Sequence, residues 1–135
     1  MNFLYYLLPK EKIAFLNQNQ TLRQAMEKME YHRYTAVPII DNAGKYIGVI
    51  REGDILWYIK NLKSFDFKLT EQIIIKDVPR ISDHESITIN AEIDEIIDLA
   101  IEQNFIPVVD DLGTFIGIVT RKAIITEQFK MKRGK

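Results

Sequence analysis

The stretch VPIIDNAGKYIGVI at Val37–Ile50 recurs as IPVVDDLGTFIGIV at Ile106–Val119. The two copies align without a gap, and both keep one proline and two glycines at the same positions. A sequence that repeats itself in this way folds as similar halves that cover one another's apolar surface. We therefore expect a pseudo-symmetric pair of repeats, with any binding site where the two meet.

Each copy predicts two short strands joined by a tight turn. The turn sequences Asp41–Gly44 and Asp110–Gly113 begin with Asp and end with Gly. Asp accepts hydrogen bonds from the backbone of such a turn, and Gly tolerates the positive φ that hairpin turns need. The strands on either side of each turn are therefore expected to be antiparallel neighbours.

Amphipathic helices flank both predicted hairpins. Thr21 is a favourable N-cap, and the apolar residues behind it recur at helical spacing. The same spacing precedes the second copy, and a further helix is expected after each hairpin. The positions that carry these patterns are Leu22, Ala25, Met26 and Met29; Ile93, Ile96, Ile97 and Ala100; Ile55, Leu56 and Ile59; and Ile124, Ile125, Gln128 and Phe129. Strands and helices mixed in this order predict the α/β class (α+β).

The composition excludes several classes of function. The chain has 135 residues, is 47% hydrophobic and carries a formal net charge of −1, which offers no field to attract DNA or RNA. The lack of cysteine excludes disulfides, thiol catalysis and thiolate metal sites, and suits a reducing compartment. No apolar stretch approaches the ~20 residues of a membrane-spanning helix. We expect a cytoplasmic protein that binds neither a nucleic-acid polymer nor a membrane.

The order of these motifs resembles the CBS domain. Each copy has an apolar-Pro-apolar-apolar-Asp strand before its turn, and the second copy continues into Gly-x-x-Thr at Gly117–Thr120. Two such units in tandem, from about residue 12 to residue 129, resemble a CBS pair, or Bateman module. The resemblance implies two βαββα-type repeats packed around a pseudo-twofold axis as one compact module. Segments 8–14, 78–82 and 117–122 are similar to the small stand-alone CBS pairs of Gram-positive bacteria, several of which bind cyclic di-AMP.

The predicted organisation is a single CBS pair over residues 1–135. Repeat one extends from about residue 8 to 63, a linker from about 64 to 80, and repeat two from about 81 to 129. The preceding segment Phe3–Leu8 lacks the features of a signal peptide and predicts a short helix, ended by Pro9, that packs on the core or on a second subunit. A basic tail follows at 130–135, and we expect it to be frayed.

The resemblance implies two nucleotide clefts between the repeats, in which a lead-in strand contacts adenine, a Thr binds phosphate and an Asp binds ribose. The residues carried over to the first, cleft A, are Lys12, Ile13, Ala14, Tyr34, Thr35, Ala36, Pro38, Thr120, Arg121 and Lys122. Ala123 replaces the ribose-binding Asp there, which suits a ligand with more phosphate per sugar. The alternative is that Thr120 caps the last helix and the basic residues lie on a solvated face.

The second cleft, cleft B, is less regular. Its residues are Arg51, Asp54, Arg80, Phe105 and Pro107, with Arg51 where Thr is expected. Asp54 is either a ribose ligand or the N-cap of the helix that follows it.

No catalytic motif is present. The sequence has no nucleophile elbow, P-loop or dinucleotide fingerprint. His32 and His84 are isolated in the sequence, which disfavours a metal site. We expect a protein that is not an enzyme and has no metal or other cofactor.

The leading hypothesis is a regulatory protein that binds an adenine nucleotide, with cyclic di-AMP favoured, and modulates a partner protein. The alternatives are an AMP/ADP/ATP energy sensor, which would depend on Asp54, and a ligand-free dimerisation or scaffold module, which Ala123 and Arg51 favour. A homodimer is expected, because the helices after the two hairpins carry more apolar residues than one core-facing stripe requires. These residues are Ile55, Leu56, Trp57 and Ile59 with Ile124 and Ile125.

Overall fold

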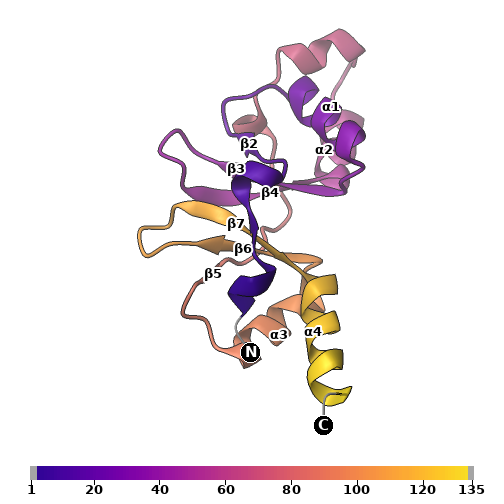
Figure 1. Ribbon diagram of the computed structural model, residues 1–135. Coiled ribbons are helices and arrows are strands. Elements are labelled where there is room, and N and C mark those ends of the chain that lie inside the picture. The colour runs from indigo at the N-terminus through magenta and orange to yellow at the C-terminus, as the bar shows by residue number, and fades with distance from the viewer. Residues whose placement is uncertain (1–2, 134–135) are drawn as a thin grey trace. The chain divides into compact units, whose positions relative to one another are not determined.

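The computed structural model describes residues 3–133, which divide into two compact units (Figure 1). Residues 14–83 form the first, here called the N-repeat unit. Residues 84–133 form the second, the C-repeat unit, together with residues 3–13 from the start of the chain. Residues 3–13 thus pack with the second sequence repeat rather than with the first.

The N-repeat unit has the element order β-α-β-β-α. Its sheet has the order β2-β3-β4, in which β2 is parallel to β3, and β3 is antiparallel to β4. The elements are β2 (Leu16–Asn17), α1 (Leu22–His32), β3 (Ala36–Ile40), β4 (Tyr46–Arg51) and α2 (Glu52–Lys60). Two short 3-10 helices follow, η3 (Phe67–Glu71) and η4 (Ile75–Asp77).

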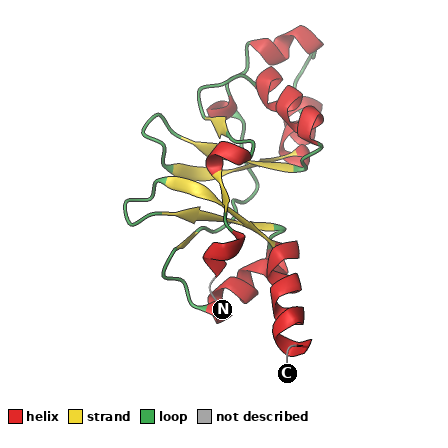
Figure 2. Cartoon of the chain, viewed as in Figure 1, coloured by secondary structure: helices red, strands yellow, loops and turns green. Residues whose placement is uncertain are grey.

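The C-repeat unit has the same order with one strand added. Its sheet has the order β1-β7-β6-β5, in which β1 is contributed by the start of the chain. The elements are η1 (Phe3–Tyr6), β1 (Leu8–Pro9), η2 (Lys10–Lys12), β5 (Ile87–Thr88), α3 (Ile93–Glu102), β6 (Phe105–Val109), β7 (Phe115–Thr120) and α4 (Arg121–Arg133). The predicted βαββα order is therefore confirmed in both units, and Figure 2 shows this mixture of helices and strands.

The two predicted hairpins are confirmed, and both turns use the same hydrogen bonds. Asp41 Oδ1 accepts from the N–H groups of Ala43 and Lys45, each at 2.9 Å. Asp110 Oδ1 accepts from Leu112 and Thr114 at the same distance. Gly44 and Gly113 have φ values of 84° and 86°, a conformation that costs residues other than glycine energy.

Helix α1 begins as predicted. Thr21 Oγ1 accepts from the Gln24 N–H at 3.1 Å, and Gln24 Oε1 accepts from the Thr21 N–H at 2.9 Å, which is a capping box. The helix ends at Arg33, whose φ of 58° places a residue other than glycine in the left-handed region. This backbone conformation turns the chain into Tyr34 and β3.

Each unit has its own apolar core. The N-repeat core contains Leu16, Leu22, Ala25, Met29, Val37, Ile39, Ile50, Ile55, Ile73, Ile75 and Val78. The C-repeat core contains Phe3, Ile87, Ile96, Ala100, Ile106, Val108, Val119 and Ile124. Phe3 is only 4% exposed, which confirms that the first segment packs on a core, although its helix ends at Tyr6 instead of Pro9. The Tyr6 hydroxyl donates to Glu127 of α4 and ties this segment to the last helix.

The basic end of the chain is helical, which corrects the prediction of a frayed tail from Lys130. Helix α4 continues to Arg133, and its last turn carries Lys130, Lys132 and Arg133. Cations in this position are stabilised by the partial negative charge at the helix C-terminus. Residues 134 and 135 of the predicted tail lie outside the described residues. Within the described range of 3–133, none of the helices has the length and apolarity needed to span a bilayer.

Candidate functional site

Thr120 is the N-cap of α4. The helix begins at Arg121, and Thr120 Oγ1 accepts a hydrogen bond from the Ala123 N–H at 3.1 Å. The capping role that the sequence analysis left open is therefore present. Helix α4 is 13 residues long, so its first turn carries the partial positive charge of a full helix dipole.

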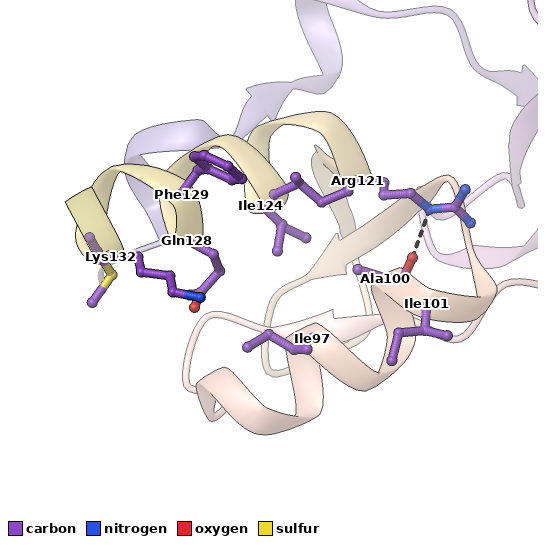
Figure 3. A pocket seen from close by; sticks show the side chains of 10 residues that line it. Ile97, Ala100, Ile101, Arg121, Ile124, Gln128, Phe129 and Lys132 are labelled. Atoms are coloured by element: carbon purple, nitrogen blue, oxygen red, sulfur yellow. Dashed lines mark hydrogen bonds between the residues drawn. The ribbon is translucent and has the colours of Figure 1, made fainter.

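Arg121 joins the start of α4 to the end of α3. Its Nε donates to the Ala100 carbonyl at 2.7 Å (Figure 3). The same nitrogen donates to the Gln103 carbonyl at 3.2 Å. Because carbonyls at a helix C-terminus lack partners within the helix, this guanidinium stabilises α3. The interpretation of Arg121 as a solvated surface residue is therefore wrong. Its two Nη nitrogens make no hydrogen bond to another residue in the described part of the chain and can still meet an anion.

Cleft A draws two further basic residues from the C-repeat unit, Lys12 and Lys122, and both are exposed. Lys122 lies in the first turn of α4, and Lys12 ends η2, which packs against β7. Ile13 is extended, with φ −127° and ψ 165°, but the segment Lys12–Ala14 is not a regular strand. The predicted lead-in strand is thus a 3-10 turn followed by extended backbone.

The remaining cleft A residues belong to the N-repeat unit: Ala14 precedes β2, Tyr34 and Thr35 lie between α1 and β3, and Ala36 and Pro38 lie in β3. Tyr34 donates its N–H to the Met29 carbonyl at 3.0 Å, and its ring stacks on His32 with 5.1 Å between centroids. Thr35 is exposed, and its carbonyl accepts from the Glu52 N–H at 3.1 Å. Ala14, Ala36 and Pro38 are buried. Cleft A draws on both units, and its assembly remains a prediction.

Asp54 of predicted cleft B is a buried structural residue. It is only 4% exposed, and its Oδ2 accepts from the Arg51 N–H at 2.9 Å while Oδ1 accepts from the Ile81 N–H at 3.1 Å. Arg51 is the N-cap of α2 and Asp54 is the third helical residue, so the prediction of Asp54 as N-cap was wrong. Both carboxylate oxygens are already engaged by backbone amides.

The end of the linker lies along β4 through an ion pair that we call the linker clamp, made of Arg80 and Asp83. Arg80 Nε donates to Asp83 Oδ1 at 2.8 Å, and Arg80 Nη2 donates to Oδ2 at 3.3 Å. Asp83 Oδ1 also accepts from the Val49 N–H at 3.0 Å. Beside the clamp, Arg51 Nη1 donates to Ser82 Oγ at 3.0 Å.

The sequence analysis included Arg80 in cleft B but missed Asp83. The signal that could have found it is the spacing of three residues between Arg80 and Asp83 next to Ser82.

The linker clamp and its surroundings shift the pKa of two groups, the Asp83 carboxyl and the Tyr46 hydroxyl. Burial opposes ionisation of the Asp83 carboxyl, but hydrogen bonds from the Arg80 side chain and the Val49 N–H favour the anion more strongly, so the pKa of Asp83 lies below its usual value. Burial and the Asp83 carboxylate raise the pKa of Tyr46 far above its usual value, although Arg80 and Arg51 oppose that rise. Asp83 is therefore ionised and Tyr46 neutral at physiological pH.

Phe105 and Pro107, the other cleft B residues, are buried in β6 of the C-repeat unit. The Phe105 ring packs against buried His84 with 4.7 Å between centroids. His84 Nε2 forms a hydrogen bond with Asn104 Oδ1 at 3.0 Å. Among residues 3–133, no group of three His, Cys, Asp or Glu side chains is arranged to hold a metal ion.

Each unit also has an apolar groove between its two helices. Figure 3 shows side chains that line the groove between α3 and α4. This groove has a volume of about 770 Å³, and the groove between α1 and α2 has a volume of about 460 Å³. Residues of the predicted dimer face divide between core and surface. Ile55 and Ile124 are 7% and 3% exposed and form the core-facing stripe of their helices. Leu56, Trp57 and Ile125 are 57%, 49% and 54% exposed.

Known proteins resemble this chain over almost its whole length. Cyclic di-AMP receptor B of Bacillus subtilis (strain 168) is 26% identical over 129 residues, which are 96% of this chain and 87% of that protein. The crystal structure of CbpB in complex with c-di-AMP has a TM-score of 0.86 at 25% identity and covers 99% of this chain and 88% of that one. Listeria monocytogenes CbpB, also solved with c-di-AMP, has the same fold, with a TM-score of 0.85 at 24% identity over 100% of both chains.

The repeated motifs and the fold agree with a family model. The predicted order of strands and helices is present in both units. The model of the CBS domain matches residues 7–61 and 71–130, and this chain therefore belongs to the CBS domain family, as a tandem pair.

Proposed function

We propose that this protein is a regulatory sensor that binds cyclic di-AMP between its CBS repeats and thereby modulates a partner protein. The observation that carries this proposal is the similarity, over nearly the full length, to a protein named as a cyclic di-AMP receptor and to a structure solved with c-di-AMP. The proposed site is cleft A, with Lys12, Ile13, Ala14, Tyr34, Thr35, Ala36, Pro38, Thr120, Arg121 and Lys122.

The chemistry at the start of α4 supports a phosphate-rich ligand. The partial positive charge of the helix dipole favours an anion there. Lys122 is exposed in this first turn, and the Arg121 Nη atoms are available while Nε holds α3. A phosphate bound there would meet charge-assisted donors, which are the stronger class of hydrogen bond.

Two side chains argue against a mononucleotide such as AMP, ADP or ATP as the ligand. Ala123 cannot hold ribose hydroxyls in cleft A. Asp54, on which the energy-sensor alternative depends, directs both carboxylate oxygens to the backbone amides of Arg51 and Ile81. A ribose could displace these amides only by breaking two hydrogen bonds to a charged carboxylate, which costs about 1–3 kcal/mol.

A sensor of this kind leaves its ligand unchanged, and we propose that the protein is not an enzyme. We also propose a homodimer, supported by the exposed apolar residues on the helices that follow the hairpins. Leu56, Trp57, Ile125 and Phe129 are between 49% and 60% exposed. The regulated partner would be a second protein that responds to the ligand-bound dimer.

Isothermal titration calorimetry of the full chain tests the ligand. We expect binding of cyclic di-AMP and no measurable binding of cyclic di-GMP, AMP or ATP at the same concentrations. Lys122→Ala should weaken binding, whereas Lys76→Ala, an exposed lysine of η4 outside cleft A, should not. Binding of AMP or ATP with no binding of cyclic di-AMP would favour an energy sensor, and no binding of any nucleotide would favour a scaffold.

A further inference from the structure

The two units close the same edge of their sheets by different means. In the C-repeat unit, the outer edge of β7 is paired with β1, where Pro9 lies opposite Gly117. In the N-repeat unit, β4 ends the sheet, and the linker clamp meets its outer edge. Asp83 accepts from the Val49 N–H at 3.0 Å, and Arg80 Nη2 donates to the Ile47 carbonyl at 3.4 Å. An ion pair therefore satisfies backbone groups that a neighbouring strand satisfies in the other unit.

The close approach of Asp83 depends on glycine at position 48. A Cβ on Gly48 would lie 2.3 Å from Asp83 Oδ1, a distance that nonbonded atoms do not reach. At the corresponding Gly117, a Cβ would instead lie 2.2 Å from the backbone carbonyl oxygen of Leu8. The same glycine of the repeat thus admits a strand in one unit and a carboxylate in the other.

The Asp83 carboxylate occupies a receptor for an anion. A backbone N–H and two nitrogens of one guanidinium converge on it, the donor set that also binds phosphate. The two residues before Asp83 keep its carboxylate in place. The Ile81 N–H donates to buried Asp54, and Ser82 Oγ accepts from Arg51. The segment from Arg80 to Asp83 is thereby attached to both β4 and the start of α2.

We propose that Asp83 is a built-in anion that fills a phosphate-binding position of the N-repeat unit and so keeps that position closed to nucleotides. The consequence for selectivity rests on the proposed function: with this position closed, a nucleotide binds through cleft A alone. The presence of the anion receptor itself does not depend on cyclic di-AMP binding.

Removal of the Asp83 carboxylate should leave the Val49 N–H and the Arg80 guanidinium able to bind another anion. ATP is the probe, because the wild-type protein is not expected to bind it. Asp83→Ala should bind ATP at least about tenfold more tightly than wild type, the size expected from new charge-assisted hydrogen bonds to phosphate. The double variant Arg80→Ala/Asp83→Ala should lose this gain, because the guanidinium is then missing. Asp77→Ala, which removes an exposed linker carboxylate outside the clamp, should behave like wild type.

Each variant is titrated with ATP by calorimetry after circular dichroism and thermal melting have established that it is folded. If Asp83→Ala does not fold, Asp83→Asn and Gly48→Ala take its place, since the first removes the charge and the second displaces the carboxylate. A folded variant that binds ATP no better than wild type would overturn the proposal. Equal binding by the single and double variants would overturn it too, because the ATP would then lie elsewhere. Failure of wild type to bind cyclic di-AMP would reject the proposed function and leave the ATP comparison valid.

Discussion

Arg121 Nε lies 2.7 Å from the carbonyl oxygen of Ala100, so that the first residue of α4 binds the last turn of α3. The same nitrogen reaches the Gln103 carbonyl, and the Arg121 N–H donates to the Asn104 carbonyl at 2.9 Å. A residue that the family resemblance assigns to cleft A therefore also holds two helices of one unit together. Its two roles can be separated by measuring stability and affinity on the same variants.

Replacement of Arg121 should lower stability. Arg121→Ala leaves the carbonyls of Ala100 and Gln103 without their charged donor, and we expect a loss of about 1–3 kcal/mol in the free energy of unfolding. Urea denaturation followed by circular dichroism measures it. Lys130→Ala, which removes an exposed cation from the same helix, is the control and should change stability little. Equal stability of Arg121→Ala and wild type would mean that this contact contributes nothing.

Replacement of Lys122 should reduce affinity without reducing stability. We expect a dissociation constant for cyclic di-AMP in the micromolar range, about −8 kcal/mol. Because Lys122 is exposed, Lys122→Ala should cost about 1.5–3 kcal/mol of binding, or roughly 10- to 100-fold, through a lost charge-assisted hydrogen bond. Calorimetry against wild type and Lys76→Ala decides this, and unchanged affinity would remove Lys122 from the proposed site. Arg121→Ala should show a comparable loss of affinity together with its loss of stability.

Replacement of Asp54 should lower stability and change the affinity for cyclic di-AMP little. Asp54→Ala leaves the N–H groups of Arg51 and Ile81 without their charged acceptor, which should cost about 1–3 kcal/mol of stability. The affinity of the folded variant for cyclic di-AMP should stay close to that of wild type, because Asp54 is not a cleft A residue. Thermal melting and calorimetry on this variant and on Asp77→Ala test both statements. A selective loss of cyclic di-AMP binding would move the site to cleft B.

The linker clamp should make stability depend on acidic pH. The pKa of Asp83 is lowered in the folded protein, because the hydrogen bonds that it accepts outweigh the effect of burial. In the pH range between the folded and unfolded pKa values, the unfolded state binds more protons, so stability rises with pH there. The contribution of Asp83 is complete above its unfolded pKa and is lost as pH falls through the folded pKa.

Unfolding in urea at a series of pH values from 3 to 6 measures this dependence. The charged groups around Asp83 are Arg80 and Arg51, and Tyr46 stays neutral because its pKa is raised far above its usual value. Asp83→Asn should therefore show a weaker fall in stability toward low pH than wild type. If wild type and Asp83→Asn lose the same amount of stability between pH 6 and pH 3, the lowered pKa of Asp83 would be contradicted.

A homodimer should form through the exposed apolar residues of α2 and α4. A specific interface of this kind buries about 1,200–2,000 Å². Size-exclusion chromatography with light scattering at tens of micromolar should give the mass of a dimer. Ile125→Asp and Trp57→Asp place a charge on exposed positions and should shift the protein toward the monomer, whereas Tyr31→Asp, at an exposed position of α1, should not. A wild-type monomer would reject the homodimer.

Much of the fold could be predicted because its signals are local. The Asp and Gly residues of the two turns act within four or five positions of the chain, and the same is true of the capping pair Thr21 and Gln24. The repeated stretch at Val37–Ile50 and Ile106–Val119 indicates the family from residue types and spacing alone. The alternative of Asp54 as N-cap was wrong by three residues, because a carboxylate at the third helical position reaches back to the N–H of the N-cap residue, as in a capping box.

The sequence by itself determined the duplicated βαββα plan, the two hairpins, the cap of α1 and the absence of cysteine chemistry. Each of these depends on residue type and on spacing within a few positions. Only the tertiary structure decided that Arg121 reaches Ala100 and that Asp83 reaches Val49. These partners are 21 and 34 positions apart in the chain, and no local pattern encodes which distant backbone group a charged side chain will meet. The folded units bring such groups together because their cores position the strands and helices that carry them.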